Sequence, residues 1–315
     1  MGANHFRILR ELRDFEVISV VDPNPTYLLS TVSGSPPHTC KSLDELDPSS
    51  FDAAIVAVPT NLHGEVASQL IRMGKHLLIE KPICSNVEEA RELISLAHAH
   101  SIKLAVGYVE RFNPAVIKLK EVIEHGYLGK PLHYSFTRVG GYPEDSGQNN
   151  NVLIDLAVHD IDVLKILHGE MRHVASACHS SVKKHVPDTA EILLRGADEG
   201  ASASIHVNWI TPTKIRNLRV TGTGGVGVID YMLQTCTVFG GNLLSSRKAP
   251  KINFKELVEA YAGSDKIEFL VDKGEPLKME LIEFAQLLRG ESNSSCSGEE
   301  ALYSLQLAEE VFSHG

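Results

Sequence analysis

The sequence predicts an α/β domain with a doubly wound parallel sheet, followed by an α+β domain with an open, mostly antiparallel sheet. Two observations lead to this prediction. Short apolar runs alternate with helical patterns early in the chain, and strand patterns follow one another in series further on. A length of 315 residues suits two domains, because a domain holds ~150 residues on average. The predicted domains span residues 1–112 and 113–315.

The first domain is predicted from four apolar runs rich in β-branched residues, which are typical of buried strands, at 16–21, 53–58, 76–79 and 102–106. Helical patterns lie at 6–12, 61–73 and 86–99. Gly74 marks the end of the second helix, and Ser85 and Asn86, followed by two glutamates, mark the start of the third. Strands that alternate with helices of this length form βαβ units, which build a parallel sheet.

The second domain begins with a predicted helix at 115–124, which ends at Gly126, and a strand at 132–138. A strongly periodic helix follows at 152–167. From 172 to 238 the pattern is that of successive strands separated by turns, and helices at 276–288 and 299–312 come last. Strands in series favour antiparallel pairing, with one or two helices on a face of the sheet.

Composition excludes several classes of partner. Thirty lysines and arginines against forty aspartates and glutamates give a net charge of −10, which argues against nucleic acid or an acidic membrane surface. The five cysteines lie far apart without a C-x-x-C pair, a pattern that suits reduced thiols and predicts no metal site. No apolar run approaches the ~20 residues that cross a bilayer. We therefore expect a cytoplasmic protein that binds a small molecule.

Asp22 is the first candidate functional residue, because it ends an apolar strand about twenty residues after a glycine at a helix start. In a dinucleotide-binding fold, the acid at that place hydrogen-bonds the adenosine ribose hydroxyls. A carboxylate there repels a 2′-phosphate, so the residue favours NAD over NADP. The alternative is that the Asp-Pro-Asn-Pro segment forms only a turn.

Lys81 lies in Glu80-Lys81-Pro82, directly after the predicted strand at 76–79. Ligands of open α/β sheets bind at the carboxyl ends of the strands, where a lysine ammonium can approach a hydroxyl group that is being oxidised. The neighbouring proline can fix the loop through a cis peptide bond. The alternative is a solvated loop lysine.

Asp155 and His159 are four residues apart in the helix at 152–167, so the two side chains share one face. A carboxylate next to an imidazole orients it and strengthens it as a general base. The alternative is a histidine paired along an exposed helix. Asp160 and Asp162 are competing partners for the imidazole.

Gly2 is the glycine at the start of the first predicted helix. A complete dinucleotide fingerprint has a buried strand and then G-x-G-x-x-G before that helix, whereas Met1 to His5 leads directly into the helical pattern. We expect Gly2 to be the last glycine of a fingerprint that starts upstream; the alternative is a sheet without its central strand. The strands at 16–21 and 53–58 then have exposed edges or pair directly. We expect weak NAD binding and low activity in this form.

Four segments that follow one another in order resemble the Gfo/Idh/MocA oxidoreductases, the relatives of glucose-fructose oxidoreductase and inositol dehydrogenase. They are Asp22, Pro59-Thr-Asn-Leu-His63, Gly74-Lys-His-Leu-Leu-Ile-Glu-Lys-Pro82 and Asp155-Leu-Ala-Val-His-Asp-Ile-Asp162. The resemblance covers essentially the whole chain. It implies a Rossmann domain that binds NAD, here without its first strand, and a second domain whose open sheet helps to assemble a homodimer or homotetramer.

The resemblance also implies roles for individual residues. Lys81 is implied as a catalytic or substrate-orienting group, and His159 as the proton acceptor with Asp155 beside it. The implied cofactor-binding residues are Gly2, Asn4, His5, Asp22, Pro59, Asn61, His63, Glu80 and Lys81. The segments Val106–Pro114 and Leu153–Asp162 are most similar to the UDP-N-acetylglucosamine 3-dehydrogenase branch, which implies Arg111, Asn113 and Arg138 as substrate contacts.

The expected function is therefore hydride transfer from a sugar hydroxyl carbon to NAD, with the 3-position of a UDP-linked N-acetylamino sugar as the expected site. One alternative is a free-sugar or inositol dehydrogenase of the same family. Another is a non-catalytic protein that senses a dinucleotide or a sugar; the incomplete glycine loop favours it, and the presence of Lys81 and His159 argues against it.

Overall fold

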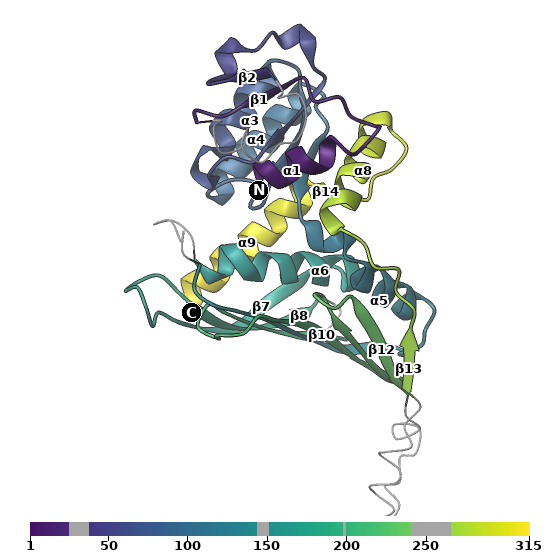
Figure 1. The fold of residues 1–315 in the computed structure, drawn as a ribbon. Coiled ribbons are helices and arrows are strands. Elements are labelled where there is room, and N and C mark those ends of the chain that lie inside the picture. The colour runs from purple at the N-terminus through teal and green to yellow at the C-terminus, as the bar shows by residue number, and fades with distance from the viewer. Residues whose placement is uncertain (25–37, 144–150, 198–199, 241–265) are drawn as a thin grey trace, which may run out of the picture. The chain divides into compact units, whose positions relative to one another are not determined.

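The computed structural model describes residues 1–24, 38–143, 151–197, 200–240 and 266–315, which divide into two units (Figure 1). Unit 1 comprises Met1–Val109 and Glu275–Leu305, and unit 2 comprises Glu110–Gly274 and Gln306–Gly315. The division after Val109 lies close to the boundary predicted at residue 112. The segment 275–305, which the sequence placed in the second domain, belongs instead to unit 1.

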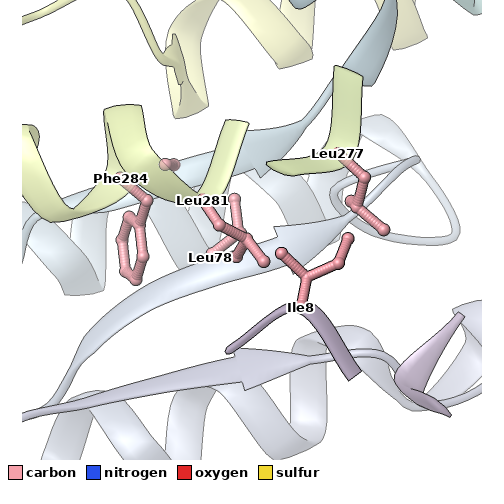
Figure 2. Packing of buried hydrophobic residues seen from close by; sticks show 6 residues of the cluster. Ile8, Leu78, Leu277, Leu281 and Phe284 are labelled. Carbon is pink, nitrogen blue, oxygen red and sulfur yellow. The ribbon is translucent and has the colours of Figure 1, made fainter. Parts of the chain in front are cut away.

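Helix α8 (Pro276–Arg289) belongs to unit 1 because its apolar face is buried there. Leu277, Leu281 and Phe284 follow a spacing of four and three residues, which forms a single stripe along a helix. Figure 2 shows this stripe against Ile8 of α1 and Leu78 of β4. The periodicity of the segment predicted the helix, but not the surface that the helix covers.

The main sheet of unit 1 is parallel at its centre. Strands β3, β4 and β5 pair in parallel, and a short strand β14 pairs antiparallel with β5, so the order is β14-β5-β4-β3. The strands span Ala53–Val56 (β3), His76–Glu80 (β4), Leu104–Gly107 (β5) and Cys296–Ser297 (β14). The helices are α1 (Gly2–Leu9), α3 (His63–Arg72), α4 (Val87–Ala99) and α8. Asn86 caps α4 by accepting the Glu89 N–H at 2.9 Å, as the sequence predicted.

The parallel strands of unit 1 are divided between two sheets. Strand β1 (Ser19–Val21) pairs in parallel with β2 (His38–Cys40), and within the described residues no ladder joins this pair to β3. Among the described residues, β1 and β3 are therefore not paired with each other. Most of β3 is only half-buried, whereas β4 is buried from Leu77 to Glu80. Each of β1 and β3 thus has one edge without a partner strand among the described residues.

Unit 2 is built on an eight-stranded sheet of order β13-β12-β11-β10-β6-β9-β8-β7. All neighbours are antiparallel except β6 and β9, which are parallel. The strands are β6 (Pro131–Val139), β7 (Met171–His179), β8 (Thr189–Gly196), β9 (Ser202–Asn208), β10 (Ile215–Gly222), β11 (Gly225–Asp230), β12 (Thr235–Gly240) and β13 (Lys266–Phe269).

Helices cover one face of this sheet. Figure 1 shows α5 (Pro114–Glu124) and α6 (Val158–His168) along it. Burial alternates along the strands, as in β8, where Ala190, Ile192 and Leu194 are buried and the residues between them are exposed. In Figure 1 no described helix of unit 2 covers the opposite face. The predicted open, mostly antiparallel sheet is confirmed.

Several elements differ from the sequence-based expectation at their ends. The first helix spans Gly2–Leu9 instead of 6–12, because the turn at Met1 already accepts the N–H groups of Asn4 and His5. The helix expected from residue 61 begins with a 3-10 turn, and the helix expected from residue 152 begins with a π-helical turn, Leu153–Ala157. The short 3-10 turns are Leu43–Glu45, Pro48–Ser50, Thr60–Leu62 and Val109–Phe112.

The final helix, α9 (Gly298–His314), contributes residues to both units. No helix in the described part of the chain is long and apolar enough to cross a bilayer. All five cysteines carry free thiols, and burial raises the pKa of Cys84 to about 12.

Candidate functional site

The carboxyl ends of the parallel strands of unit 1 carry polar groups. Asp22 follows β1 directly and is exposed, and its Oδ1 accepts the N–H of Asn24 at 2.7 Å. The 3-10 turn Thr60–Leu62 follows β3, and Lys81 follows β4. Because this end of an open α/β sheet is where ligands bind, these segments form the candidate site of unit 1.

Glu80 anchors the first helix to the end of β4. Its Oε1 lies 2.6 Å from Nε2 of His5, and both side chains are buried. Gly2 and Asn4, at the start of the same helix, are exposed. A Cβ added at Gly2 would meet nothing closer than the Cβ of Ala57, at 3.9 Å. The first turn of α1 is therefore open to a ligand, whereas His5 holds the helix in place.

His63 connects the loops that follow β3 and β4. Its ring is buried, with Nδ1 at 2.8 Å from the carbonyl oxygen of Pro82 and Nε2 at 3.0 Å from that of Val58. A neutral imidazole has a single N–H and can donate to only one of these carbonyls at a time. Pro59 and Asn61 lie next to this contact and are exposed. The histidine fixes the loops, and the exposed residues are the ones that a ligand can reach.

Lys81 lies at the end of β4 and is partly exposed. The Lys81–Pro82 peptide bond is cis, as the sequence allowed. The next residues are packed inward, since Pro82, Ile83 and Cys84 are all buried. The lysine thus stands at the boundary between a buried strand and the surface.

Asp155 and His159 lie on consecutive helical turns of unit 2. Asp155 belongs to the π-helical turn, and His159 to the first turn of α6. The side chain of Asn151 caps this helix by accepting the N–H groups of Leu153 and Ile154 at 2.9 and 3.1 Å. Both Asp155 and His159 are half-buried. π-helical turns inside α-helices occur often at functional sites.

Asp155 accepts a hydrogen bond from the Trp209 indole. The donor Nε1 lies 3.2 Å from Oδ2 of Asp155, and Trp209 is buried. This residue follows the last residue of β9 and was not identified from the sequence. Two features could have indicated Trp209 as a site residue. It is the single tryptophan of the chain, and it directly follows a strand.

Arg138 is the centre of a buried ionic cluster in unit 2. Its Nε lies 3.0 Å from Oδ1 of Asp160, and its Nη1 lies 2.9 Å from Oε1 of Glu110. The Arg216 Nη1 lies 3.9 Å from the same Glu110 oxygen, and the Arg138 guanidinium lies over the Tyr231 ring at 5.0 Å. Burial opposes the charge of Arg138, but the two carboxylates outweigh it and raise its pKa. Burial and the nearby Arg138 charge lower the pKa of Arg216.

Arg111 and Asn113 also point into unit 2. Arg111 holds Asp162 through two nitrogens, with contacts of 2.6 to 3.1 Å. Asn113 caps α5 by accepting the Ala115 N–H, and its amide donates to Glu110 at 3.0 Å. All four polar residues of these contacts are buried. The three residues implied as substrate contacts, Arg111, Asn113 and Arg138, are thus bound to groups of their own unit, and their contact with substrate stays a prediction.

Each unit carries some of the predicted site residues. Unit 1 brings together the loops after β3 and β4 and places Lys81 beside them. Unit 2 carries Asp155 and His159, and the Trp209 indole N–H donates to the Asp155 carboxylate. Sequence reasoning missed Glu110, Asp160 and Arg216 as members of the buried cluster; the signal for Glu110 was its place in the segment Val106–Pro114.

The residues of unit 1 fit a dinucleotide. The exposed Asp22 carboxylate is an acceptor for ribose hydroxyls. The first turn of α1 presents backbone N–H groups without intrahelical partners, and Gly2 leaves space in front of them. Such a turn attracts phosphate groups. These features place acceptors for a ribose and donors for a pyrophosphate at one end of the parallel strands.

Two family models match consecutive parts of the chain. Residues 1–108 match the oxidoreductase family with an NAD-binding Rossmann fold, GFO/IDH/MocA. Residues 116–227 match the GFO/IDH/MocA C-terminal domain. The two matches follow the order of the two units and reach both candidate sites.

Curated relatives include two enzymes that act on polyhydroxylated compounds by name. The chain is 32% identical over 127 residues to scyllo-inositol 2-dehydrogenase (NAD(+)) from Bacillus subtilis, which covers 39% of the chain and 37% of that protein. It is 26% identical over 208 residues to UDP-N-acetylglucosamine 3-dehydrogenase from Acidithiobacillus ferrooxidans, which covers 64% of the chain and 63% of that protein. The matches thus span less than two thirds of each relative.

Solved structures share the fold over nearly the whole chain. UDP-N-acetylglucosamine 3-dehydrogenase from Acidithiobacillus ferrooxidans matches with a TM-score of 0.81 at 21% identity, over 99% of this chain and 93% of that one. The WlbA dehydrogenase from Bordetella pertussis, solved with NADH and UDP-GlcNAcA, matches with a TM-score of 0.77 at 20% identity, over 99% and 92%. At these identities the likeness concerns the fold.

Proposed function

Because this chain belongs to the GFO/IDH/MocA family of NAD-binding oxidoreductases, we propose that it is an NAD-dependent sugar dehydrogenase. The proposed substrate is a UDP-linked N-acetylamino sugar, oxidised at its 3-hydroxyl. Support for this substrate class comes from the relative and the neighbour that carry a UDP-sugar in their names. The observation that carries the proposal is that the exposed Asp22 and the partly exposed Lys81 each follow the carboxyl end of a parallel strand, β1 and β4.

Asp22, the first turn of α1 and the exposed Pro59 and Asn61 would hold the dinucleotide. When bound, the nicotinamide ring supplies a hydride acceptor at its C4. The Asp22 carboxylate binds the ribose hydroxyls and repels a 2′-phosphate, so NAD is preferred to NADP. Glu80 and His63 support the dinucleotide site indirectly: Glu80 holds α1 in place, and His63 holds the two loops in place.

The chain's own part in the reaction is to bind the sugar and to remove a proton. Oxidation of a secondary alcohol releases a hydride from carbon and a proton from the hydroxyl group. We assign the proton to His159, which Asp155 orients, and the placement of the hydroxyl to the Lys81 ammonium. The positive charge of the lysine also favours the alkoxide that develops as the proton leaves.

Arg138 and Arg111 serve this site by anchoring the helix that carries His159. Arg138 binds Asp160 and Arg111 binds Asp162, which follow His159 by one and three residues on α6. Since their donors are committed to buried carboxylates, we propose that they position the helix and do not contact substrate. Asn113 supports the same cluster through Glu110.

A second copy of the chain is the proposed macromolecular partner, as a homodimer or homotetramer in the cytoplasm. The face of the unit 2 sheet opposite to α5 and α6 carries exposed apolar side chains, such as Leu193 of β8 and Phe239 of β12. Light scattering after size exclusion tests this, and a monomer at micromolar concentration would contradict it.

An inositol or free-sugar dehydrogenase is the second candidate, which the scyllo-inositol 2-dehydrogenase relative favours. The test is NADH formation with UDP-N-acetylglucosamine, myo-inositol, scyllo-inositol and glucose. We expect turnover of the UDP-sugar, its loss in Lys81→Ala and His159→Gln, and its retention in the control Lys41→Ala, which changes an exposed lysine of the same unit. Turnover of the cyclitols alone supports the second candidate, and turnover of none contradicts both.

A further inference from the structure

The one tryptophan of the chain lies against the carboxylate that we assign to the catalytic pair. We propose that Trp209 is a positioning residue, which fixes the orientation and charge of Asp155 through its indole N–H. The donor atom lies 3.2 Å from Oδ2 of Asp155. An indole N–H donates but cannot accept, and the indole does not ionise near neutral pH. The contact therefore favours the ionised carboxylate over the neutral acid.

The indole is held rigidly enough to act in this way. Trp209 follows β9, and its backbone N–H donates to the carbonyl oxygen of Asp188 at 2.8 Å. The preceding residue, Asn208, is buried, and its Oδ1 accepts the N–H groups of Ile210 and Thr211. The Tyr142 ring packs edge-on against the indole at 5.3 Å between centroids. These contacts fix both the backbone and the ring plane.

Asp155 accepts a hydrogen bond from outside its own helix, and its charge also acts on Arg216 of β10. It lies in the π-helical turn, where its backbone N–H donates to the carbonyl oxygen of Asn151. Its side chain is half-buried, so solvent alone does not fix one rotamer. Trp209 approaches from β9, an element of the sheet, and so couples the helix to the sheet at this carboxylate. A carboxylate held in one orientation gives His159 a constant partner.

This inference rests on the proposed pairing of Asp155 with His159, and its test separates the two. The imidazole of His159 is titrated by NMR in the full chain, with the signal assigned by its loss in His159→Gln. We expect Asp155→Asn to lower the pKa of His159 by about one unit, the lower end of the effect of a nearby opposite charge. Trp209→Phe keeps the aromatic bulk, removes the N–H, and should lower it in the same direction by a smaller amount.

Val207→Ala is the matched control, because it removes buried methyl groups from the same strand without removing a donor. We expect it to leave the pKa of His159 unchanged. If Asp155→Asn lowers that pKa and Trp209→Phe does not, the role of Trp209 is wrong and the proposed function stands. If Asp155→Asn also has no effect, the pairing of Asp155 with His159 fails, and the role of Trp209 with it.

Fluorescence tests the contact without any substitution of the tryptophan. Since Trp209 is the single tryptophan, all indole emission reports on this place. We expect the emission maximum or intensity at neutral pH to change in Asp155→Asn, because a charge next to the ring is removed. We also expect a transition of the wild-type emission in the acid range that Asp155→Asn lacks. An emission identical in the two proteins would overturn the proposal.

Discussion

Arg111 binds the carboxylate of Asp162 through Nε and Nη2, and both side chains are almost completely buried. The pair joins the 3-10 turn Val109–Phe112 to α6, the helix that carries His159. Forked contacts of this kind fix direction as well as distance. We propose that this arginine, which the resemblance implies as a substrate contact, acts as a structural clamp on the helix that carries His159.

Breaking this pair from one side should be costly. We expect Arg111→Met to destabilise unit 2 by about 3–5 kcal/mol, because it leaves an uncompensated buried carboxylate. The double variant Arg111→Met/Asp162→Leu should be more stable than Arg111→Met, since no charge is then buried alone. Urea unfolding of the wild type, the two single variants Arg111→Met and Asp162→Leu, and the double variant measures both effects. If the free energy of unfolding of the double variant falls by the sum of the decreases in the two single variants, the clamp is contradicted.

Unit 1 should lose stability in acid through His76. Its Nδ1 accepts the Lys103 N–H at 3.1 Å, which requires the neutral ring, and burial together with the Lys103 charge lowers its pKa. The unfolded chain then binds a proton near pH 6.5 that the folded chain does not bind. Stability is full above this value and falls as the pH drops toward the lowered pKa of the folded state.

The measurement is the free energy of unfolding between pH 7 and pH 5. We expect His76→Gln to flatten this dependence, and His100→Gln to leave it unchanged, because the His100 side chain is exposed. If the free energy of unfolding falls equally steeply with pH in the wild type and in His76→Gln, groups other than His76 control the loss of stability in acid.

The split sheet of unit 1 predicts uneven protection of backbone amides. Strand β4 is buried and paired on both sides, whereas β1 has three residues and pairs with β2 alone among the described strands. We expect amides of Leu77 to Ile79 to exchange slowest in this unit and those of Ser19 to Val21 to exchange far faster. Hydrogen exchange followed by mass spectrometry measures both peptides. Equal protection would mean that the edge of β1 is covered in solution.

Asp22 should decide between the two nicotinamide dinucleotides. We expect Asp22→Ser to weaken NADH binding about tenfold, since hydrogen bonds to a charged group contribute about 1.5–3 kcal/mol. NADPH binding should gain relative to NADH, because the repulsion of the 2′-phosphate is removed. Asp44→Ser is the control, as it changes another exposed aspartate of unit 1. An unchanged ratio of the two affinities would place the ribose elsewhere.

The sequence predicted those features that depend on local pattern. The strands and helices of both units follow from apolar periodicity, and Asn86 was recognisable as a cap from the glutamates behind it. Strands β2, β13 and β14 were not predicted, because they are short and exist only through pairing with a neighbour. The membership of α8 in unit 1 depends on the shape of a distant surface, Ile8 and Leu78, which no local pattern shows.

The candidate site was predicted by residue type but not by contact. Lys81 and Asp22 lie at strand ends, as expected from the pattern of strands before them. The choice of partners could not be predicted, since Arg138 and Arg111 each had several acids in reach and the fold selected Asp160 and Asp162. Trp209 and Asp155 are 54 positions apart, so only the tertiary structure joins them.

The measurement that tests the central claim most directly is a calorimetric titration of the purified 315-residue chain with NADH. We expect saturable binding with one site per chain, weakened in Asp22→Ser and kept in Asp44→Ser. The split sheet leads us to expect a modest affinity. If NADH does not bind saturably, or binds equally well without the Asp22 carboxylate, the chain does not hold the dinucleotide as proposed.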